Sequence, residues 1–294
     1  MEAPSSIFRE LRQRYHTKLQ EAIWYITDDG TPSNADKSSR PSVAIAKGML
    51  EAKQQLTPRA VGQTSGKVFT DATLDFLKDA FLLLEHIRPG PWRFSSSQAK
   101  VGIAAFYQYE HLAILQDLLD RLEKRGSGDE KDLRAMFAGG YLITPDIIVA
   151  RSPIDDRRIN QGKTIISSQQ GIAAHTPLRS INNKTEMLHA SISCKWTLRS
   201  DRAQNARTEA LNLIRNRKGH APHIVVVTGE PWPSRLASLG MGTGDIDCLY
   251  HMALLEMQEA VHKYGDDTSK ELLDTLVRGR RLRDISDLPF DLAI

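Results

Sequence analysis

Three short runs of β-branched and aromatic residues in the second half of the chain limit the folds that it can adopt. The runs are YLITPDIIVAR (141–151), HASISCKWTL (189–198) and HIVVVTGE (223–230), and each has the length and composition of a β-strand. A helical pattern between the last two runs begins at Asp201, a suitable N-cap, and is closed by Gly219. Strands that alternate with helices predict an α/β fold, with a mixed central sheet flanked by helices.

Much of the remaining sequence has the periodicity of amphipathic helices. Helices are expected over residues 6–26, 45–56, 69–87, 105–124, 245–264 and 268–279. Turn-forming residues predict loops at 28–42 and 62–66. Residues 152–187, between the first two expected strands, are polar and irregular. An insertion of this length in a compact domain is usually functional or an assembly element.

The composition is typical of one compact domain, expected to span residues 1–294. Hydrophobic residues make up 40% of the chain and charged residues 26%, which is enough apolar material for a sizeable core. No run of 18 apolar residues exists, and the N-terminus lacks the apolar segment of a signal peptide, so no membrane span is expected. The two cysteines, Cys194 and Cys248, indicate a reduced, cytoplasmic protein without a disulfide framework.

Basic residues are concentrated between positions 195 and 218. Seven lysines and arginines lie there against only Asp201 and Glu209, whereas the net charge of the whole chain is only +3. Such a local excess suits a phosphate backbone as a partner. The alternative interpretation is a helix face whose charges are simply exposed to water.

Residues suited to phosphodiester hydrolysis lie on the first two expected strands. This reaction uses a metal ion that carboxylates hold and that lowers the pKa of a bound water, with a lysine to orient that water. Many nucleases place Pro-Asp on one strand and an acid, one spacer and a lysine on the next. Here Pro145-Asp146 sits within the first strand and Lys195 on the second, but Ser193 occupies the place of the acid. Glu209 lies two turns into the following helix and supplies the missing carboxylate if that helix folds back along the strand.

The segment SISCKWTLRSDRAQNARTEALNLIRNRKG (191–219) resembles the NgoMIV family of CCGG-recognising type II restriction endonucleases, within the PD-(D/E)xK nuclease superfamily. In that family the second catalytic acid has moved from the strand to the following helix. The likeness extends over nearly the whole chain, because long motifs occur in the same order. These are SNAD (33–36), GQTSG (62–66), HIRPG (86–90), ITPDIIV (143–149), PHIVVVT (222–228), GTGDIDC (242–248) and DISDLP (284–289).

The resemblance implies a restriction-endonuclease-like core and magnesium-dependent cleavage of double-stranded DNA. It assigns Asp146 as the principal metal ligand and the backbone carbonyl of Cys194 as a second ligand. Two Mg²⁺ ions, about 4 Å apart, would occupy each active site. Lys195 would be the catalytic lysine, and Glu209 would be the displaced acid that acts through a water on the metal.

One position departs from the family pattern. The family has a further glutamate just after GQTSG, and here that position is Thr70, whose hydroxyl supplies no charge. Asp71 is adjacent, but one residue along a helix turns the side chain by about 100°. Whether Thr70 or Asp71 takes the place of this glutamate stays open.

The resemblance also implies which residues read the DNA sequence. Arginine donates two hydrogen bonds to guanine, and aspartate accepts one from cytosine N4. Arg199, Asp201 and Arg202 are expected to read the inner CCGG, although flanking arginines around an N-cap aspartate are the alternative. Asp36 and Gln63 match positions that read the outer base pair, which gives GCCGGC, cut after the first G to leave 5′ overhangs.

Cutting both strands of a palindrome requires two active sites related by a two-fold axis, so a homodimer is the minimum. The resemblance implies a homotetramer of two back-to-back dimers, joined by an arm at about 152–187. Two other functions remain open. One is a less specific repair or junction nuclease of the same superfamily, and the other is a DNA-binding protein that does not cleave.

Overall fold

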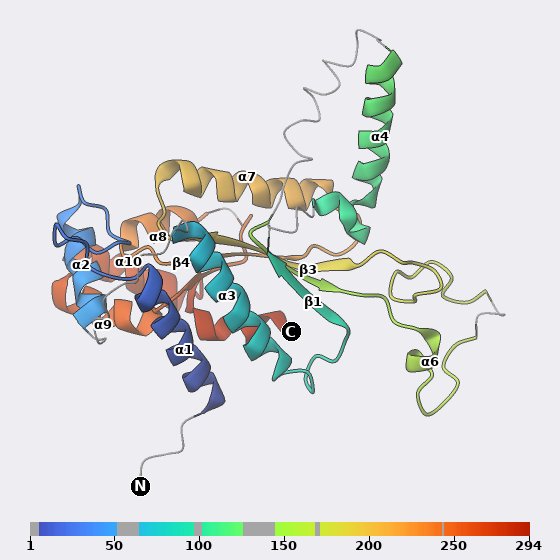
Figure 1. Ribbon diagram of the computed structural model, residues 1–294, viewed down its shortest axis with the longest axis horizontal. Helices are drawn as coiled ribbons and strands as arrows, with labels where there is room; N and C mark the ends of the chain where they lie inside the picture. Colours follow the sequence, from blue (N-terminus) through green and yellow to red (C-terminus); the bar gives the residue numbers. More distant parts are fainter. Residues whose placement is uncertain (1–5, 52–64, 97–101, 126–144, 168–170, 243) are drawn as a thin grey trace. The chain divides into compact units, whose positions relative to one another are not determined.

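The computed structural model describes residues 6–51, 65–96, 102–125, 145–167, 171–242 and 244–294 (Figure 1). The chain divides into two compact units. The first contains Met1–Arg88, Ile192–Ala210 and Ile224–Ile294, and the second contains Pro89–Ser191 and Leu211–His223. Each unit is therefore assembled from segments that are far apart in the sequence.

The described strands form one mixed sheet of six strands in the order β1-β2-β3-β4-β5-β6. They are β1 (Trp92–Ser96), β2 (Ile147–Arg151), β3 (Met187–Lys195), β4 (His223–Thr228), β5 (Cys248–His251) and β6 (Leu282–Asp284). β1 and β2 pair antiparallel, whereas β4 pairs with β5 and β5 with β6 in parallel. Helices flank this sheet, so the predicted α/β class is confirmed.

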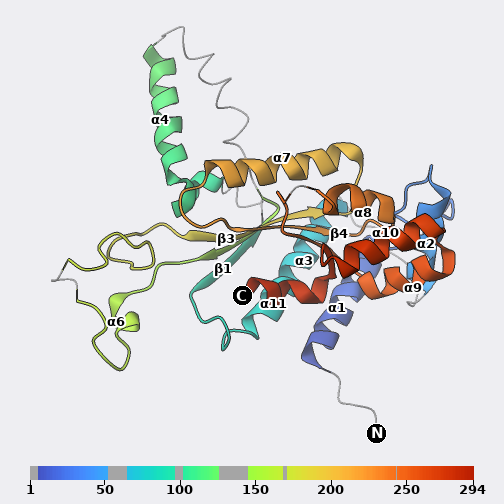
Figure 2. The ribbon, with the colours of Figure 1, turned by 180° about the vertical axis from the view of Figure 1, so that it is seen from behind.

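Helices of the first unit pack in pairs (Figures 1 and 2). The pairs are α1 (Ile7–Ala22) with α3 (Ser65–Leu82), α2 (Arg40–Glu51) with α9 (Leu254–Tyr264), and α8 (Pro233–Gly240) with α10 (Asp267–Arg278). The short α11 (Leu288–Leu292) also contacts α3. Arg12 of α1 also joins this helix to α9 and to β6, because its guanidinium donates to Glu256 of α9 and to Asp284 of β6 at 2.7–2.9 Å.

The second unit contains β1, β2, most of β3, α4 (Glu110–Arg125), the short α6 (Asp156–Ile159) and the end of α7 (Ser200–Asn216). Gln108 joins the start of α4 to β3, because its side chain donates to the carbonyl oxygen of Leu188 at 2.7 Å and accepts from its N–H at 2.9 Å. The buried Tyr109 hydroxyl donates to the carbonyl oxygen of Leu213 in α7 at 3.0 Å. These bonds fix the segment before α4 against the strand and the helix.

The helices expected from periodicity are largely present, with shifted ends. α1, α2, α3, α4 and α10 confirm five of them, although α2 and α3 begin four or five residues earlier than expected. The expected helix over 245–264 is wrong in its first part, because Cys248–His251 is the fully buried strand β5. The expected loop at 62–66 is wrong for Ser65 and Gly66, which open α3, and its other residues lie outside the described part.

The expected strand positions need two corrections around the sequence motif. Asp146 does not sit within a strand, because β2 begins at Ile147 and Asp146 forms a bend before it. Pro145 explains this, since proline has no N–H to offer to a sheet. β3 ends at Lys195 rather than at Leu198, and it is covered on both faces, so Ser191 and Ser193 are buried as well as Cys194.

The described residues of the segment 152–187 are irregular, as expected, but an ion pair between Arg179 and Asp156 organises them. Arg179 is 4% exposed and donates two hydrogen bonds to the carboxylate of Asp156, at 2.9 and 2.6 Å. The same guanidinium donates to the carbonyl oxygens of Ile172 and Ala173 at 2.9 and 3.1 Å. A single side chain therefore holds α6 and the returning segment together.

Two further expectations concern membranes and cysteines. Within the described ranges, no helix combines the length and the apolar character that crossing a membrane requires. Cys194 and Cys248 are both buried free thiols, as the sequence indicates for a protein without a disulfide framework.

Candidate active site

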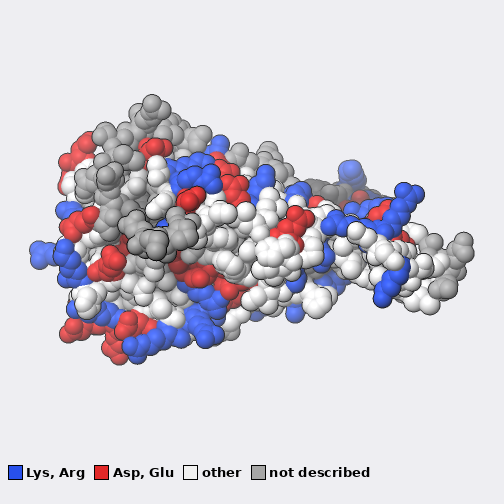
Figure 3. Space-filling view, turned by 90° about the horizontal axis from the view of Figure 1, so that it is seen from below, with Lys and Arg blue, Asp and Glu red and all other residues white. Residues whose placement is uncertain are grey.

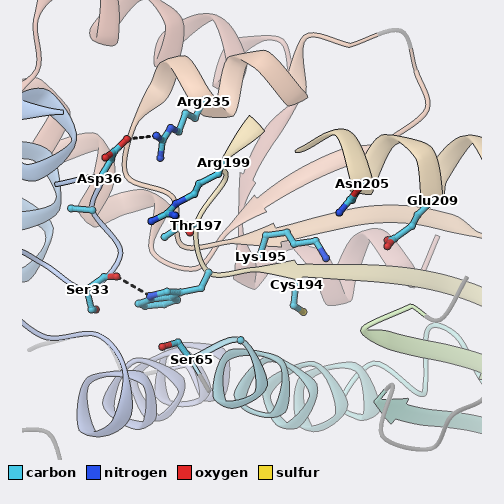
Figure 4. Close-up of a pocket in the computed structure, with 13 residues that line it drawn as sticks. Ser33, Asp36, Ser65, Cys194, Lys195, Thr197, Arg199, Asn205, Glu209 and Arg235 are labelled. Carbon is cyan, nitrogen blue, oxygen red and sulfur yellow. Dashed lines mark hydrogen bonds and ion pairs between the residues drawn. The ribbon is translucent and has the colours of Figure 1, made fainter. Parts of the chain in front are cut away.

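A cavity of about 600 Å³ lies in the first unit, beside the end of β3 (Figure 4). Loops, helices and the strand all contribute to its wall. The lining residues are Ser33, Ala35, Asp36, Ser65, Gly66, Cys194, Lys195, Trp196, Thr197, Arg199, Asn205, Glu209 and Arg235. Five residues singled out from the sequence thus share one cavity, namely Asp36, Cys194, Lys195, Arg199 and Glu209.

Lys195 ends β3 and is half-buried at the cavity wall. Its carbonyl oxygen accepts a hydrogen bond of 2.7 Å from the hydroxyl of Thr228 and one of 3.3 Å from the N–H of Gly229. Both donors come from the end of β4, so the neighbouring strand fixes the Lys195 peptide. The Lys195 ammonium and the Glu209 carboxylate extend toward each other from β3 and α7 (Figure 4).

Glu209 reaches the cavity because α7 begins at Ser200, soon after β3, and runs back past the strand end. Asn205 lies one helical turn before Glu209, on the same face, and also lines the cavity. A lysine and a carboxylate facing one another across an open cavity can orient a water molecule and take up its proton.

Two side chains, those of Trp196 and Asn34, attach the 33–36 loop to this site. The indole nitrogen of Trp196 donates to the carbonyl oxygen of Ser33 at 3.3 Å, and its ring meets that of Phe69 with centroids 5.3 Å apart. The side chain of Asn34 is fully buried and donates to the carbonyl oxygen of Gly229 at 2.7 Å. The loop that carries Asp36 is therefore held by the same two strand ends that hold Lys195.

Asp36 forms an ion pair with Arg235 of α8 at the cavity wall (Figure 4). Hydrogen bonds from the hydroxyl and the N–H of Ser38 hold the pKa of Asp36 below its usual value, and the charge of Arg235 adds to this effect. The Arg235 guanidinium lies 5.5 Å from the centroid of the Trp232 ring and 3.5 Å from a carboxylate oxygen of Glu230. These contacts present Asp36 and Arg235 as a fixed acceptor and donor.

Sequence reasoning missed Arg235, Asn205 and Glu230. A signal for Arg235 was available, because Pro233 at the first turn of a helix after a buried strand marks a strand-to-helix junction. Such a junction places the following residues beside the other strand ends. No sequence pattern distinguishes Asn205 or Glu230.

The other expected site residues do not line this cavity, or lie wholly or partly outside the described residues. Asp146 is half-buried and belongs to the second unit. Asp201 and Arg202 lie in the first turn of α7, so the expectation that Asp201 is the N-cap is wrong by at least one residue, and their side chains are outside the described part. Gln63 lies outside the described residues. Thr70 is buried on α3, one turn beyond Gly66 of the cavity wall.

The charges of the 195–218 segment are partly neutralised within the protein. Lys218 forms an ion pair with Glu110 at 2.5 Å, and Arg207 donates to the carbonyl oxygen of Ser238. Lysines and arginines are interspersed with acidic residues on the face that Figure 3 shows. At the cavity wall, positive charge comes from Lys195 and Arg199 of this segment and from Arg235 of α8.

The described residues of the cavity provide few protein ligands for a metal ion. Among the described residues, no group of three His, Cys, Asp or Glu side chains converges in a way that would hold an ion. Glu209 provides one carboxylate, and Cys194 is another residue of the cavity wall. Mg²⁺ suits such a donor set, because it keeps several waters and uses only one or two carboxylates.

Comparisons with known proteins fix the family. The model of the NgoMIV restriction enzyme family matches residues 15–294. The chain belongs to this family. The type II restriction enzyme NgoMIV of Neisseria gonorrhoeae is 44% identical over 293 residues, which cover 98% of this chain and 99% of the relative. As a member of the NgoMIV family, the protein is a restriction endonuclease, an enzyme that cuts DNA at specific sites.

A solved structure is also similar to this chain, at a low level. It is a complex of the restriction endonuclease PspGI with substrate DNA, 12% identical, and the match covers 97% of this chain and 91% of the other with a TM-score of 0.26. A TM-score of this size does not establish a shared fold. The assignment to the NgoMIV family therefore rests on the family match and on the 44% identity.

Proposed function

We propose that this enzyme cuts double-stranded DNA at a palindrome containing CCGG, with GCCGGC as the full site, after the first G to leave 5′ overhangs. One observation carries the proposal. Lys195 and Glu209, which suit hydrolysis, share a single cavity with Asp36, Arg199 and Arg235, which suit the edges of G·C pairs. A site that combines both chemistries supports cleavage at a specific sequence more than cleavage of any duplex.

The chemistry proposed for the cavity needs a divalent metal, and we take it to be Mg²⁺, with two ions in each active site. Asp146, the carbonyl oxygen of Cys194 and, through water, Glu209 would hold it. When bound, such ions stabilise the charge that develops on the phosphate and make water more acidic. Asp146 enters this site as part of the proposal, because it lies in the second unit of the chain.

The protein's own side chains have separable tasks. The Lys195 ammonium would orient the attacking water and stabilise negative charge on the phosphate, and its peptide is fixed for this by Thr228 and Gly229. Glu209 would accept a proton from that water, since its carboxylate extends toward Lys195 (Figure 4). Neither residue needs to touch a base.

Base reading would fall to the opposite part of the cavity wall. Arg199 is exposed there and suits the inner guanines, together with Asp201 and Arg202 of the first turn of α7. The Asp36–Arg235 pair supplies one acceptor and one bidentate donor, which match cytosine N4 and guanine O6 and N7 of the outer pair. Gln63 would add a contact to the same pair.

We also propose that the active protein is a homotetramer of two dimers, in the cytoplasm, and that the 152–187 segment is the arm between the dimers. Support comes from its construction around the Arg179–Asp156 pair, which gives it a defined shape. Three isoleucines, Ile165, Ile172 and Ile181, are 59–61% exposed on this segment. Apolar side chains presented on an ordered segment suit an interface between subunits.

The experiment that tests the function uses a plasmid with one GCCGGC site, incubated with and without Mg²⁺. Defined fragments that appear only with Mg²⁺ are the expected result. Matched plasmids in which either the outer or the inner pair is changed serve as controls. A smear of products would indicate a nonspecific repair or junction nuclease, and a gel shift without cleavage would indicate a DNA-binding protein.

A further inference from the structure

Glu230 is a fully buried carboxylate directly behind the cavity wall. It follows β4, and its exposed fraction is 0%. One carboxylate oxygen accepts a hydrogen bond of 2.8 Å from the N–H of Leu198, and the other accepts one of 3.2 Å from the N–H of Trp232. The first oxygen also lies 3.5 Å from the guanidinium of Arg235.

These contacts join two segments that line the cavity from different parts of the chain. Leu198 precedes Arg199, in the turn between β3 and α7. Arg235 lies in α8 and carries the ion pair with Asp36. The Glu230 carboxylate is therefore a shared acceptor for the backbone behind Arg199 and for the side chain of Arg235.

Burial makes this arrangement costly, which argues against a role as a general stabiliser. Removing a carboxylate from water is unfavourable unless hydrogen bonds and opposite charge compensate for it. Burial raises the pKa of Glu230 to about 7, although the Leu198 N–H and the Arg235 charge act in the opposite direction. The ion pair with Arg235 is therefore in place when Glu230 is ionised, and it is weakened when the carboxyl is protonated.

We propose that Glu230 is a positioning residue for sequence recognition, which holds Arg199 and Arg235 in a fixed relation so that both sets of base contacts form together. This inference rests on the proposed function of the cavity. Glu230 reaches neither the bases nor Lys195 through its side chain. Its loss should therefore reduce discrimination between sequences and raise KM, and it should leave kcat at saturating DNA nearly unchanged.

The test compares wild type with Glu230→Gln, which keeps the size of the side chain and removes its charge. Cleavage rates are measured on a GCCGGC duplex and on duplexes with either the outer or the inner pair changed. We expect the ratio of kcat/KM between correct and changed sites to fall about tenfold, the equivalent of losing one bidentate base contact. We expect kcat on the correct site to stay within about threefold.

A matched control is Glu256→Gln. Glu256 is also a buried carboxylate of the first unit and is also paired with an arginine, Arg12, but it does not line the cavity. Thermal unfolding compares the stability of the two variants. A loss of discrimination in both variants would show that lower stability alone reduces discrimination, and it would overturn the proposal.

Wild type itself provides a second measurement that does not depend on how a variant folds. The charged or titratable groups that face Glu230 are Arg235 from α8, which also pairs with Asp36, and His251 from β5, whose ring donates toward the Glu230 carbonyl oxygen. Arginine stays charged, Asp36 stays ionised because its pKa is lowered, and burial lowers the pKa of His251 to about 4. Glu230 is thus the member of this group that titrates between pH 6 and pH 8.

Discrimination by wild type should therefore be lower at pH 6 than at pH 8, whereas Glu230→Gln should show no such change. Any effect of pH on the chemical step changes kcat/KM equally for the correct and the changed duplex. The ratio of the two values is therefore free of this effect. Wild type that fails to cut GCCGGC overturns the proposed function. Wild type that discriminates, with the same ratio at both pH values or with an unchanged ratio in Glu230→Gln, overturns the role of Glu230 alone.

Discussion

The hydroxyl of Thr228 donates a hydrogen bond of 2.7 Å to the carbonyl oxygen of Lys195. The same hydroxyl accepts a bond of 3.2 Å from the N–H of Glu230, and the Thr228 side chain is fully buried. One side chain on β4 therefore fixes the peptide of the proposed catalytic lysine at the end of β3.

Thr228→Val should lower kcat about tenfold, because the Lys195 carbonyl oxygen loses the hydrogen bond that Thr228 donates and small displacements are costly for catalysis. It should also lower the free energy of unfolding by about 1–3 kcal/mol, since two buried groups lose a partner. Single-turnover cleavage and urea unfolding measure the two effects. Thr228→Ser keeps the hydroxyl and should retain most of the activity. Equal rates for the valine variant and wild type would contradict the prediction.

Lys195→Ala and Asp146→Ala should each reduce cleavage by at least about 100-fold while specific binding stays nearly intact. The reason is that both residues are assigned to the chemistry and neither to base edges. Cleavage and gel-shift assays on GCCGGC duplexes measure this, with Lys47→Ala, an exposed lysine of α2, as the control. Removing Mg²⁺ with a chelator should have the same effect as either variant, and excess Mg²⁺ should reverse it. A cleavage rate within tenfold of wild type in either variant would contradict the assignment of that residue to the active site.

The sequence was sufficient for the fold class and for the placement of Lys195 and Glu209 in one cavity. Both depend on local patterns: a strand ending at Lys195 and a helix that begins five residues later bring Glu209 back beside the strand. β5 could not be predicted in this way, because the four residues Cys248–His251 are buried on both faces and show no alternation.

The roles of Arg235 and Glu230 could not be read from the sequence for a different reason. Each depends on partners about 30 to 200 positions away, such as Leu198 for Glu230 and Asp36 for Arg235. Contacts of this kind follow from the order of the strands, which composition and periodicity do not specify. Asp146 is the reverse case. The Pro-Asp motif singles it out in the sequence, but the expected position within a strand was wrong, because Asp146 follows Pro145 in a bend before β2.

Thr70→Glu should keep or raise activity, most visibly at low Mg²⁺. Thr70 is 8% exposed and lies one helical turn beyond Gly66, which lines the cavity. A carboxylate there helps to hold an ion, but without metal it is buried and unpaired, so the free energy of unfolding should fall by about 1–3 kcal/mol. Added Mg²⁺ should therefore raise Tm more in the variant than in wild type.

The control for this prediction is Asp71→Asn, which removes the neighbouring carboxylate and leaves Thr70 in place. If Asp71 supplied the family's acid instead, this change would reduce activity and Thr70→Glu would add nothing. A large loss of activity in Thr70→Glu would mean that the site has been rebuilt around the threonine.

The stability of the protein should contain a contribution from Glu230 that decreases as pH rises. Burial raises its folded-state pKa to about 7 from an ordinary 4.5. Between these values the unfolded chain releases the proton while the folded chain keeps it, so stability falls with rising pH in this window. The whole effect is at most about 3 kcal/mol. Unfolding by urea at pH 5 and pH 8 should show this drop in wild type relative to Glu230→Gln, and parallel pH curves for the two proteins would contradict it.

The last prediction concerns assembly. If two dimers are joined through the 152–187 segment and must both hold DNA, a plasmid with two GCCGGC sites should be cut faster than a matched plasmid with one site. An added oligonucleotide carrying the site should speed cleavage of the one-site plasmid, because it fills the second cleft in trans.

Replacing the exposed Ile165, Ile172 and Ile181 by serine should reduce the mass seen in analytical ultracentrifugation from that of a tetramer to that of a dimer, since it removes apolar contact between subunits. The Arg179–Asp156 pair is untouched by these changes, so the segment itself should stay folded. A wild type with a dimeric mass and equal rates on the two plasmids would rule out the tetramer and leave the 152–187 segment without an assembly role.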